Sequence, residues 1–461
     1  MRLLFTFVFS ALVVLIGTQL SSCGKQVLLS KNHLTFSKDT VVFDTVFTTI
    51  GSTTQQLKIY NKDSKTIQID EIELMGGTSS KFYMNVDGLK GTKIEDLKLE
   101  GGDSLFVFVE VTLDPNGGNL PLIIEDSIRF LTNGQNQYVK LAVWGQDAYF
   151  HYKDLNEGVW PTDKPHVIYG YAAVDSAKTL EIQAGTHIYM HKNAILYVYK
   201  STLNIYGALG NEVIIEGDRL EQDYANISGQ FYGIYFHQAR PCTIDYAIIK
   251  NGTSGVHLYD EDPENTGYTL TMTNTIIKNQ ARYGVFIFAG AKVKAENCLV
   301  GKNGTHALFV LQGGDFNFNH CDLLGYGAST NPAVGISNYY TDYKAGQTNV
   351  SSINEGKLYN CVVTGNLNTE FALDTIQMQG VVLQFDFKNT LLRSEQIYTD
   401  AFYDSSVIWN GSPAFTNPDE FDFTFGSNSA LNGNGLTSSV VSDIFGNPRN
   451  NPPDIGAIEL N

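Results

Sequence analysis

Charged residues are scarce in this sequence, and basic ones especially so. Asp, Glu, Lys and Arg make up 17% of the 461 residues, and 31 basic residues stand against 48 acidic ones, for a formal net charge of −17. Nucleic-acid binding needs a basic surface that neutralises phosphates, so the charge argues against nucleic acid as a partner. It equally argues against a broad attraction to anionic lipid, which needs basic clusters.

Cysteine is also rare, and the common metal and catalytic motifs are missing. The five cysteines form no CxxC pair and no paired-histidine motif is present, so no structural zinc site is expected. No GxSxG, HExxH or phosphate-loop pattern occurs, which excludes the enzyme classes built on those motifs. The abundant residues are Gly (43), Tyr (25) and Phe (27). With no long helical charge pattern, this composition predicts an all-β chain.

The chain begins with an apolar run from Leu3 to about Gly17, followed by Leu-Ser-Ser-Cys ending at Cys23. The run is short for a membrane span and has the form of a secretory signal. The Leu-Ser-Ser-Cys ending resembles the bacterial lipoprotein box. That resemblance implies a signal peptide over residues 1–22, lipid on Cys23 that anchors the protein to a membrane, and a linker over 23–32. Gly24 fits the outer-membrane destination, while a periplasmic or surface-facing position stays open.

Residues 33–150 alternate in short strand-like runs such as "TVVFDTVFTTI", "KTIQIDEIEL" and "SLFVFVEVTLDP". Turn residues separate them every eight to fifteen residues or so, which is typical of a β-sandwich. The order of "LKIYNKDSKTIQIDEIEL" and "EGGDSLFVFVEVTLDP" resembles the immunoglobulin-like domains of the ASPM/SPD-2/Hydin type. Such domains usually serve as spacers or contact modules, and no site is expected in this one.

Residues 151–410 carry an internal repeat. Its landmarks are "YAIIKNG", "NTIIKNQ", "NCLVGKN", "HCDLLGY", "NCVVTGN" and "NTLLRSE", with a period near 23 residues and insertions of variable length. This spacing predicts a solenoid in which each coil buries its apolar face against the next. "LEIQAGTHIYM" and "LNIYGALGNEVIIEG" resemble the opening coils of right-handed parallel β-helix proteins of the pectin-lyase-like kind from Bacteroidetes.

When the repeats are superposed, two positions of the repeat hold similar residues in most coils. The first holds Asn274, Asn297, Asn360 and Asn389, with His320 and Tyr246 as departures. Asn tolerates the left-handed backbone of a tight bend, and in the β-helix family such stacked amides form an asparagine ladder. The second place holds Ala247, Thr275, Cys298, Cys321, Cys361 and Thr390. It calls for a small buried side chain, so free thiols are favoured, although the coil spacing does not forbid a Cys298–Cys321 bridge.

The strands after each bend place rings on their outward side. With a period of two, the outward columns are Tyr235/His237, His257/Tyr259, Phe286/Phe288 and Phe309/Leu311. In β-helix polysaccharide lyases this face carries calcium-binding carboxylates and a basic residue, which are missing here. So large an exposed aromatic surface would be unusual. Either Tyr235, Tyr259, Phe286, Phe288 and Phe309 stack on a ligand such as a sugar chain, or another segment covers them. We favour a cover by residues 326–356 or by the first domain.

Few residues are candidates for catalysis or metal binding. Asp260, Asp262 and Glu264 in "YDEDPENTGY" could hold calcium through oxygen ligands, although a solvated acidic loop is the simpler interpretation. Lys250 and Lys278 share one place in successive coils; a lysine base would need burial or neighbouring cations to lower its pKa.

Two combinations of residues are the remaining candidates for acid/base catalysis. Lys250 with Asp260 is the best available catalytic pair if the protein is an enzyme. An acid/base role for His237 or His257 beside a carboxylate is also conceivable. Each of these residues has a simpler structural interpretation, which we favour.

Residues 411–461 contain "SPAF", "DIFGNPR" and "PDIGAIE", which resemble the closing segment of exported β-helix proteins, usually spelled DIGAYE. Ile458 stands where Tyr is usual. The segment is expected to cap the open end of the solenoid. Arg449 is expected to form a structural ion pair with Asp454 or Glu459.

The sequence therefore predicts an all-β lipoprotein of the cell envelope: an Ig-like β-sandwich, then a right-handed parallel β-helix, then a C-terminal cap. A non-catalytic structural protein, or one that binds glycan or another envelope component, is the favoured function. The alternative is a polysaccharide lyase or glycoside hydrolase. Calcium is the one cofactor suggested, and a membrane and polysaccharide are the expected partners.

Overall fold

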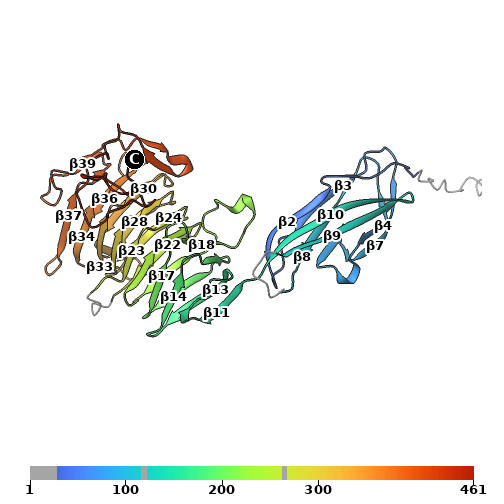
Figure 1. The fold of residues 1–461 in the computed structure, drawn as a ribbon, viewed down its shortest axis with the longest axis horizontal. Coiled ribbons are helices and arrows are strands. Elements are labelled where there is room, and N and C mark those ends of the chain that lie inside the picture. The colour runs from blue at the N-terminus through green and yellow to red at the C-terminus, as the bar shows by residue number, and fades with distance from the viewer. Residues whose placement is uncertain (1–28, 116–121, 262–266, 461) are drawn as a thin grey trace, which may run out of the picture. The chain divides into compact units, whose positions relative to one another are not determined.

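A computed structural model of the chain describes residues 29–115, 122–261 and 267–460. The chain divides into two compact units after Gln146 (Figure 1). The predicted signal peptide and Cys23 lie outside the described residues, as do Asp262 and Glu264. No described helix is long and apolar enough to cross a membrane.

The first unit is a sandwich of two sheets. One contains β1 (Thr35–Phe36), β3 (Gln55–Tyr60), β8 (Ser104–Val111), β5 (Phe82–Val86) and β6 (Leu89–Gly91), in this order. The other contains β2 (Thr40–Phe47), β10 (Gln135–Gln146), β9 (Leu122–Thr132), β4 (Ile67–Leu74) and β7 (Lys93–Leu99). Neighbours are antiparallel except β2 and β10, which are parallel. Alternate residues of each strand point into one core, as in β8, where Val107 and Val109 are fully buried.

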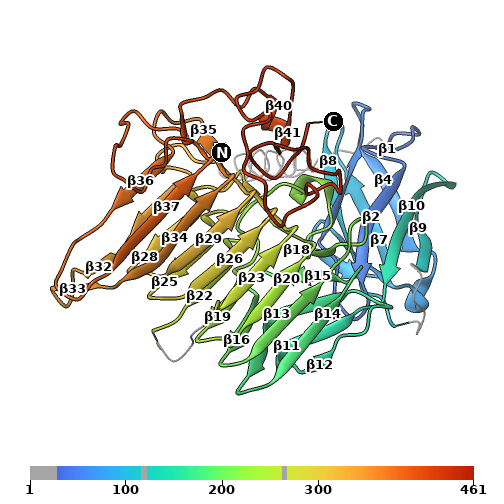
Figure 2. The same ribbon diagram turned by 60° about the vertical axis from the view of Figure 1, so that its left-hand side comes forward.

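The second unit is a solenoid of parallel strands with three faces (Figure 2). It opens with β11 (Tyr149–Leu155) and β13 (His166–Asp175), and β13 pairs with both β15 and β16. One face is called the covered face because the C-terminal segment packs on it. It contains β15 (His187–Met190), β18 (Val213–Gly217), β21 (Ala247–Lys250), β24 (Ile276–Lys278), β27 (Leu299–Gly301), β30 (Asp322–Gly325), β35 (Val362–Gly365), β38 (Leu391–Leu392) and β39 (Ile408–Trp409).

The aromatic face contains β16 (Ile195–Tyr199), β19 (Gly233–His237), β22 (Ser254–Tyr259), β25 (Tyr283–Phe288), β28 (His306–Leu311), β31 (Val334–Ser337) and β36 (Phe371–Asp374). The polar face contains β12 (Gly158–Val159), β14 (Thr179–Gln183), β17 (Thr202–Tyr206), β20 (Cys242–Asp245), β23 (Leu270–Thr273), β26 (Lys292–Glu296), β29 (Asp315–Asn319), β34 (Ile353–Tyr359) and β37 (Leu383–Lys388).

Shorter elements complete the fold. A hairpin of β32 (Tyr339–Asp342) and β33 (Gln347–Val350) leaves the solenoid between β31 and β34, and β40 (Phe415–Asn417) pairs with β41 (Asp422–Phe425). The described residues form 3₁₀ turns at Gly77–Ser79, Gln222–Tyr224 and Pro418–Glu420.

The solenoid core is built as the repeat predicts. Val285 and Ile287 are fully buried and lie in register with Leu308 and Val310 of the next coil. Each coil therefore buries its inward residues between its two neighbours, which no coil could do alone.

The ladder of polar bends is confirmed. Asn274, Asn297, Asn360 and Asn389 have φ values of 48°, 58°, 52° and 46°, and His320 and Tyr246 have 51° and 46°. Asn297 Nδ2 donates to Asn274 Oδ1 at 2.7 Å. Asn360 Nδ2 lies 3.0 Å from His320 Nε2, so the histidine replaces an amide in the ladder. Because burial lowers the pKa of His320 to about 3, this ring is neutral and accepts from Asn360.

The residue that directly follows each asparagine-ladder residue is a free cysteine in three coils. Cys298, Cys321 and Cys361 are fully buried and unbridged, so the structure contains no Cys298–Cys321 disulfide. Each sulfur donates to backbone carbonyls of its own or the preceding coil; Cys361 Sγ, for example, lies 3.1 Å from the Tyr359 oxygen. The small side chain fits beside the tight bend, which is why Ala and Thr alternate with Cys here.

The C-terminal segment lies along the flank of the later coils. Its apolar residues, among them Phe423, Ile444 and Ile455, pack on outward residues of the covered face such as Leu324 and Val362. The segment was expected to cap the open end of the solenoid, whereas the contacts of its apolar core are with one face of several coils.

Polar contacts tie this segment to the ladder. Arg449 Nη2 donates to Asn297 Oδ1 at 2.9 Å, and Leu436 N donates to Asn360 Oδ1 at 2.6 Å. The predicted structural ion pair forms between Arg449 and Glu459, at 3.3 Å and buried from solvent. The segment therefore supplies partners that the ladder amides of the later coils would otherwise lack.

Candidate functional site

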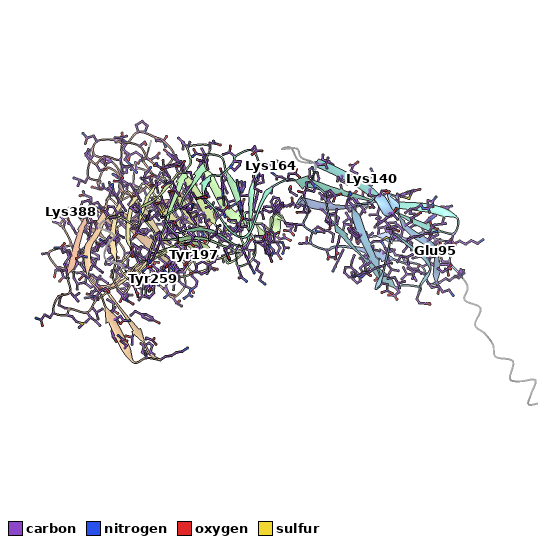
Figure 3. All side chains as sticks on the ribbon, turned by 90° about the horizontal axis from the view of Figure 1, so that it is seen from below. Glu95, Lys140, Lys164, Tyr197, Tyr259 and Lys388 are labelled. Atoms are coloured by element: carbon purple, nitrogen blue, oxygen red, sulfur yellow. The ribbon has the colours of Figure 1, made fainter. Side chains whose placement is uncertain are left out.

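The outward rings of the aromatic face stand in two columns. One column, in register from strand to strand, is Tyr197, Tyr235, His257, Phe286 and Phe309; the other is Tyr199, His237, Tyr259, Phe288 and Leu311. Figure 3 labels Tyr197 and Tyr259, one from each column. Parallel strands in register place equivalent side chains directly over one another, so the repeat brings together rings that are 20 to 40 residues apart.

These rings stack on one another along the solenoid. Ring centroids lie 4.5 Å apart for Tyr235 and His257, 4.6 Å for His257 and Phe286, and 5.5 Å for Phe286 and Phe309, with interplanar angles of 16° to 25°. The faces of the rings are therefore covered by their neighbours, and mainly their edges meet solvent. This aromatic ladder explains how so many rings can stand outward while each remains half-buried.

The sequence suggested that a sugar chain or a covering segment meets these rings, and in the structure the rings also cover one another. The hairpin from the 326–356 insertion contacts the aromatic ladder where Tyr340 meets the Phe288 ring edge-on, with ring centroids 5.9 Å apart. A cover by the first domain stays a prediction. Since Tyr235 and Phe286 already stack on neighbouring rings, their faces are not available to a ligand.

The two candidate histidines belong to the ladder. His257 Nδ1 lies 2.6 Å from Tyr232 Oη, and His237 Nδ1 lies 2.6 Å from Tyr197 Oη. Burial lowers the pKa of His257 to about 4, and burial followed by the nearby Lys200 lowers that of His237. Both rings are neutral near pH 7, and His257 is clamped between two other rings. This placement favours a packing role for them.

The aromatic ladder ends at Gly335, and a groove begins at this position. Phe309 is in register with Gly335, which is in register with Ala372. A Cβ atom at Gly335 would lie 3.2 Å from both Phe309 Cδ2 and His306 Cε1, so these rings rest on bare backbone. The groove beyond them has a volume of about 450 Å³ and is lined by His306, Phe309, Leu311, Asn331, Pro332, Gly335, Ile336, Ser337, Tyr339, Tyr340, Thr341, Tyr343, Ala372 and Asp374.

The hairpin forms one wall of this groove and a carboxylate stands on its rim. Tyr343 at the hairpin tip is 91% exposed, and Tyr340 is also exposed. Tyr339 Oη donates to Asp374 Oδ2 at 2.6 Å, and this bond raises the pKa of Tyr339. The lining contains rings, hydroxyls and one carboxylate, and neither Lys nor Arg is among its residues.

The candidate lysines lie on the covered face, away from this groove. Lys250 Nζ pairs with Glu216 Oε2 at 2.7 Å, and Glu216 Oε1 lies 2.6 Å from His187 Nε2. Lys278 Nζ sits over the Phe421 ring at 4.7 Å, and burial together with the charges of Lys250 and Lys302 lowers its pKa. Burial and neighbouring cations, the two conditions for a low lysine pKa, are thus met at Lys278.

The proposed pair of Lys250 and Asp260 is not brought together. Lys250 ends β21 on the covered face, whereas Asp260 follows β22 of the aromatic face and is only 5% exposed. Among the described residues, no group of three or more His, Cys, Asp or Glu side chains is placed to hold a metal ion. Because Asp262 and Glu264 lie outside the described residues, a calcium site in this loop stays a prediction.

A pair of carboxylates on the polar face escaped the sequence analysis. Glu355 and Asp386 line a second groove of about 300 Å³ with Lys357 and Phe385. The only sequence signal for them is the alignment of "NEGKLYN" with "QFDFKN", which puts Lys357 in register with Asp386.

Both carboxylates are fully engaged. Glu355 accepts from Tyr268 Oη at 2.6 Å, Lys357 Nζ at 2.7 Å and Asn317 Nδ2 at 3.0 Å, and these donors lower its pKa against the effect of burial. Asp386 accepts from Lys388 Nζ at 2.8 Å and from the Tyr359 hydroxyl. The lowered pKa of Glu355 makes this carboxylate a poor general acid.

Comparison with known proteins supports the fold. Residues 174–323 match the family described as "Right handed beta helix region". With the parallel sheets of the solenoid and the sandwich of the first unit, this confirms the predicted fold class. Curated proteins give no match.

Solved structures give distant likenesses. One is a family 123 glycoside hydrolase from Clostridium perfringens, studied for glycolipid glycan hydrolysis, with 7% identity and a TM-score of 0.18 over 25% of this chain and 26% of that chain. Another is the ASH or PapD-like domain 7 of human CEP192, with 11% identity and a TM-score of 0.17 over 26% of this chain and 92% of that domain. This chain thus spans about a quarter of the hydrolase, and TM-scores this low bear on neither fold nor function.

Proposed function

We propose that this protein is a non-catalytic, glycan-binding lipoprotein of the cell envelope, and that it holds saccharide in the groove at the end of the aromatic ladder. The observation that carries the proposal is the groove itself: the ladder of stacked rings ends at Gly335, and open space follows beside Phe309. A concave site that combines apolar rings with a few polar groups is the usual form of a small-molecule site.

The groove chemistry indicates the class of sugar. Tyr340 and Tyr343 offer apolar surface for the C–H side of a pyranose, and Asp374 offers a charged acceptor for its hydroxyls. No Lys or Arg lines the groove, and the protein carries a net charge of −17. A polyuronate would therefore meet repulsion without compensation. We infer a neutral or amino sugar.

The binding test is calorimetric titration of the purified chain with neutral, amino and acidic oligosaccharides. Ala372→Trp fills the groove floor and should abolish binding at this groove, and Tyr343→Ala should weaken binding there about tenfold, as expected for loss of an aromatic anchor. Tyr206→Ala removes an exposed ring from the polar face and is the matched control. Binding that is the same in Ala372→Trp as in the wild type, or a preference for polyuronates, would refute the proposal.

The lipid anchor rests on the Leu-Ser-Ser-Cys ending at Cys23. Cells fed a labelled fatty acid should incorporate the label into the wild-type chain, and the Cys23→Ala variant should remain unlabelled. Label in Cys23→Ala would contradict an anchor at this residue.

A hydrolase or lyase is the second candidate, and the groove containing Glu355 and Asp386 is the observation in its favour. Incubating the chain with a polysaccharide panel, with and without calcium, tests this candidate. Reducing ends or unsaturated products that disappear in both Glu355→Gln and Asp386→Asn would replace the non-catalytic proposal with an enzyme. Binding without turnover would remove the enzyme.

A further inference from the structure

The first unit carries its own aromatic surface, on the outward side of the β1–β3–β8–β5–β6 sheet. Tyr83 is 58% exposed and Phe106 is 40% exposed. The rings of Phe106 and Phe108 stack with centroids 6.0 Å apart, and Lys58 Nζ lies 5.1 Å from the Phe106 centroid. Exposed apolar patches on a soluble domain commonly mark a binding surface.

This surface is hollowed beside the rings. A groove of about 400 Å³ is lined by Thr54, Tyr83, Met84, Asn85, Lys90, Gly91, Thr92, Phe108 and Glu110. The strand register explains the grouping: Asn85 lies opposite Phe108 on one side and opposite Lys90 on the other, and Tyr83 lies opposite Glu110. Cross-strand neighbours of this kind have their side chains within contact distance.

One polar atom of this groove is left without a partner. Asn85 Oδ1 is buried and makes no hydrogen bond with the described residues. Such an acceptor costs free energy unless a donor reaches it, so native structures rarely keep one without a reason. Glu110, by contrast, already accepts from Thr54 Oγ1 at 2.7 Å.

We propose that this groove is a second saccharide site, specific for a neutral sugar. The rings of Tyr83 and Phe108 would pack against the C–H side of a pyranose, and the half-buried side-chain amide of Asn85, opposite Phe108, would hydrogen-bond to a sugar hydroxyl. Lys90 and Glu110 carry opposite charges, so the lining is neutral in sum and favours an uncharged ligand with both donors and acceptors.

This inference does not depend on the groove of the solenoid. The two grooves lie on separate compact units of the chain.

The test uses calorimetric titration of the full chain with oligosaccharides of glucose, mannose and N-acetylglucosamine, in a background that carries Ala372→Trp. We expect this background to retain one site per chain. Adding Tyr83→Ala or Asn85→Leu should weaken that site about tenfold or more. Asn85→Leu should leave the fold intact, because it removes an unsatisfied acceptor; circular dichroism checks this. Tyr138→Ala, which removes an exposed ring from the opposite sheet, is the control.

The outcomes separate the two proposals. If Ala372→Trp abolishes all binding, or if the remaining site ignores both Tyr83→Ala and Asn85→Leu, the second site is refuted while the solenoid groove stands. If wild type and Ala372→Trp bind alike and Tyr83→Ala removes all binding, the solenoid groove is refuted and the second site is supported.

Discussion

The polar ladder should be a main source of stability in the solenoid, and Asn360→Ala tests it most directly. Asn360 is fully buried with φ 52°. Its Nδ2 lies 3.0 Å from Asn319 Oδ1, 3.0 Å from His320 Nε2 and 2.9 Å from the Leu436 oxygen, and its Oδ1 accepts from Leu436 N at 2.6 Å. One side chain thus joins two coils and the C-terminal segment.

The expected cost follows from these contacts. Alanine at a left-handed position loses about 1 kcal/mol relative to Asn. Removing the amide also leaves buried groups without a hydrogen-bond partner. Each such group costs about 1–3 kcal/mol, and less where water or a neighbouring group takes the place of the amide. We therefore expect Asn360→Ala to lower the free energy of unfolding by about 3–5 kcal/mol, which is large for a single substitution.

The matched control is Asn389→Ala, because Asn389 has nearly the same backbone geometry, with φ 46°, but is half-buried and donates its Nδ2 to the Asn434 oxygen at 2.9 Å. Its loss should cost about 1–2 kcal/mol. Urea unfolding followed by far-ultraviolet circular dichroism measures both, and limited proteolysis reports release of residues 411–461 in Asn360→Ala. Equal losses in the two variants would refute the reasoning.

Two further predictions concern acid and thiol chemistry. Because the pKa of His257 falls from 6.5 to about 4 on folding, the unfolded chain takes up the proton first as pH drops, so stability should fall between about pH 6.5 and about pH 4. His257→Phe, which continues the ring column, should reduce that fall in the melting temperature; an unchanged pH dependence would contradict the assignment. Cys298, Cys321 and Cys361 are free and buried, so a thiol reagent should leave them unmodified in the native protein and label them after denaturation. Rapid labelling of the native chain would show that the coils open.

Much of this fold could be predicted from the sequence because the repeat determines which residues face the core and which form the bends. Inward residues of a β-helix alternate with outward ones, and bends recur at fixed places, so "NTIIKNQARYGVFIF" places Asn274 at a left-handed bend and Val285 and Ile287 in the core. Each assignment depends on local geometry and period alone. The small place holding Cys298 could be recognised for the same reason.

The contacts of the outward side chains could be determined only from the tertiary structure. Phe286 points outward by period, but whether a neighbouring ring, a covering segment or a ligand meets it depends on ring orientation and on the next coil. The groove exists because Gly335 and Ala372 interrupt a column whose members lie more than 20 residues apart. Lys250 and Asp260, close in sequence, are separated by a corner of the coil. Period determines which face a residue occupies, whereas contacts across coils, which determine chemistry, require the stacked structure.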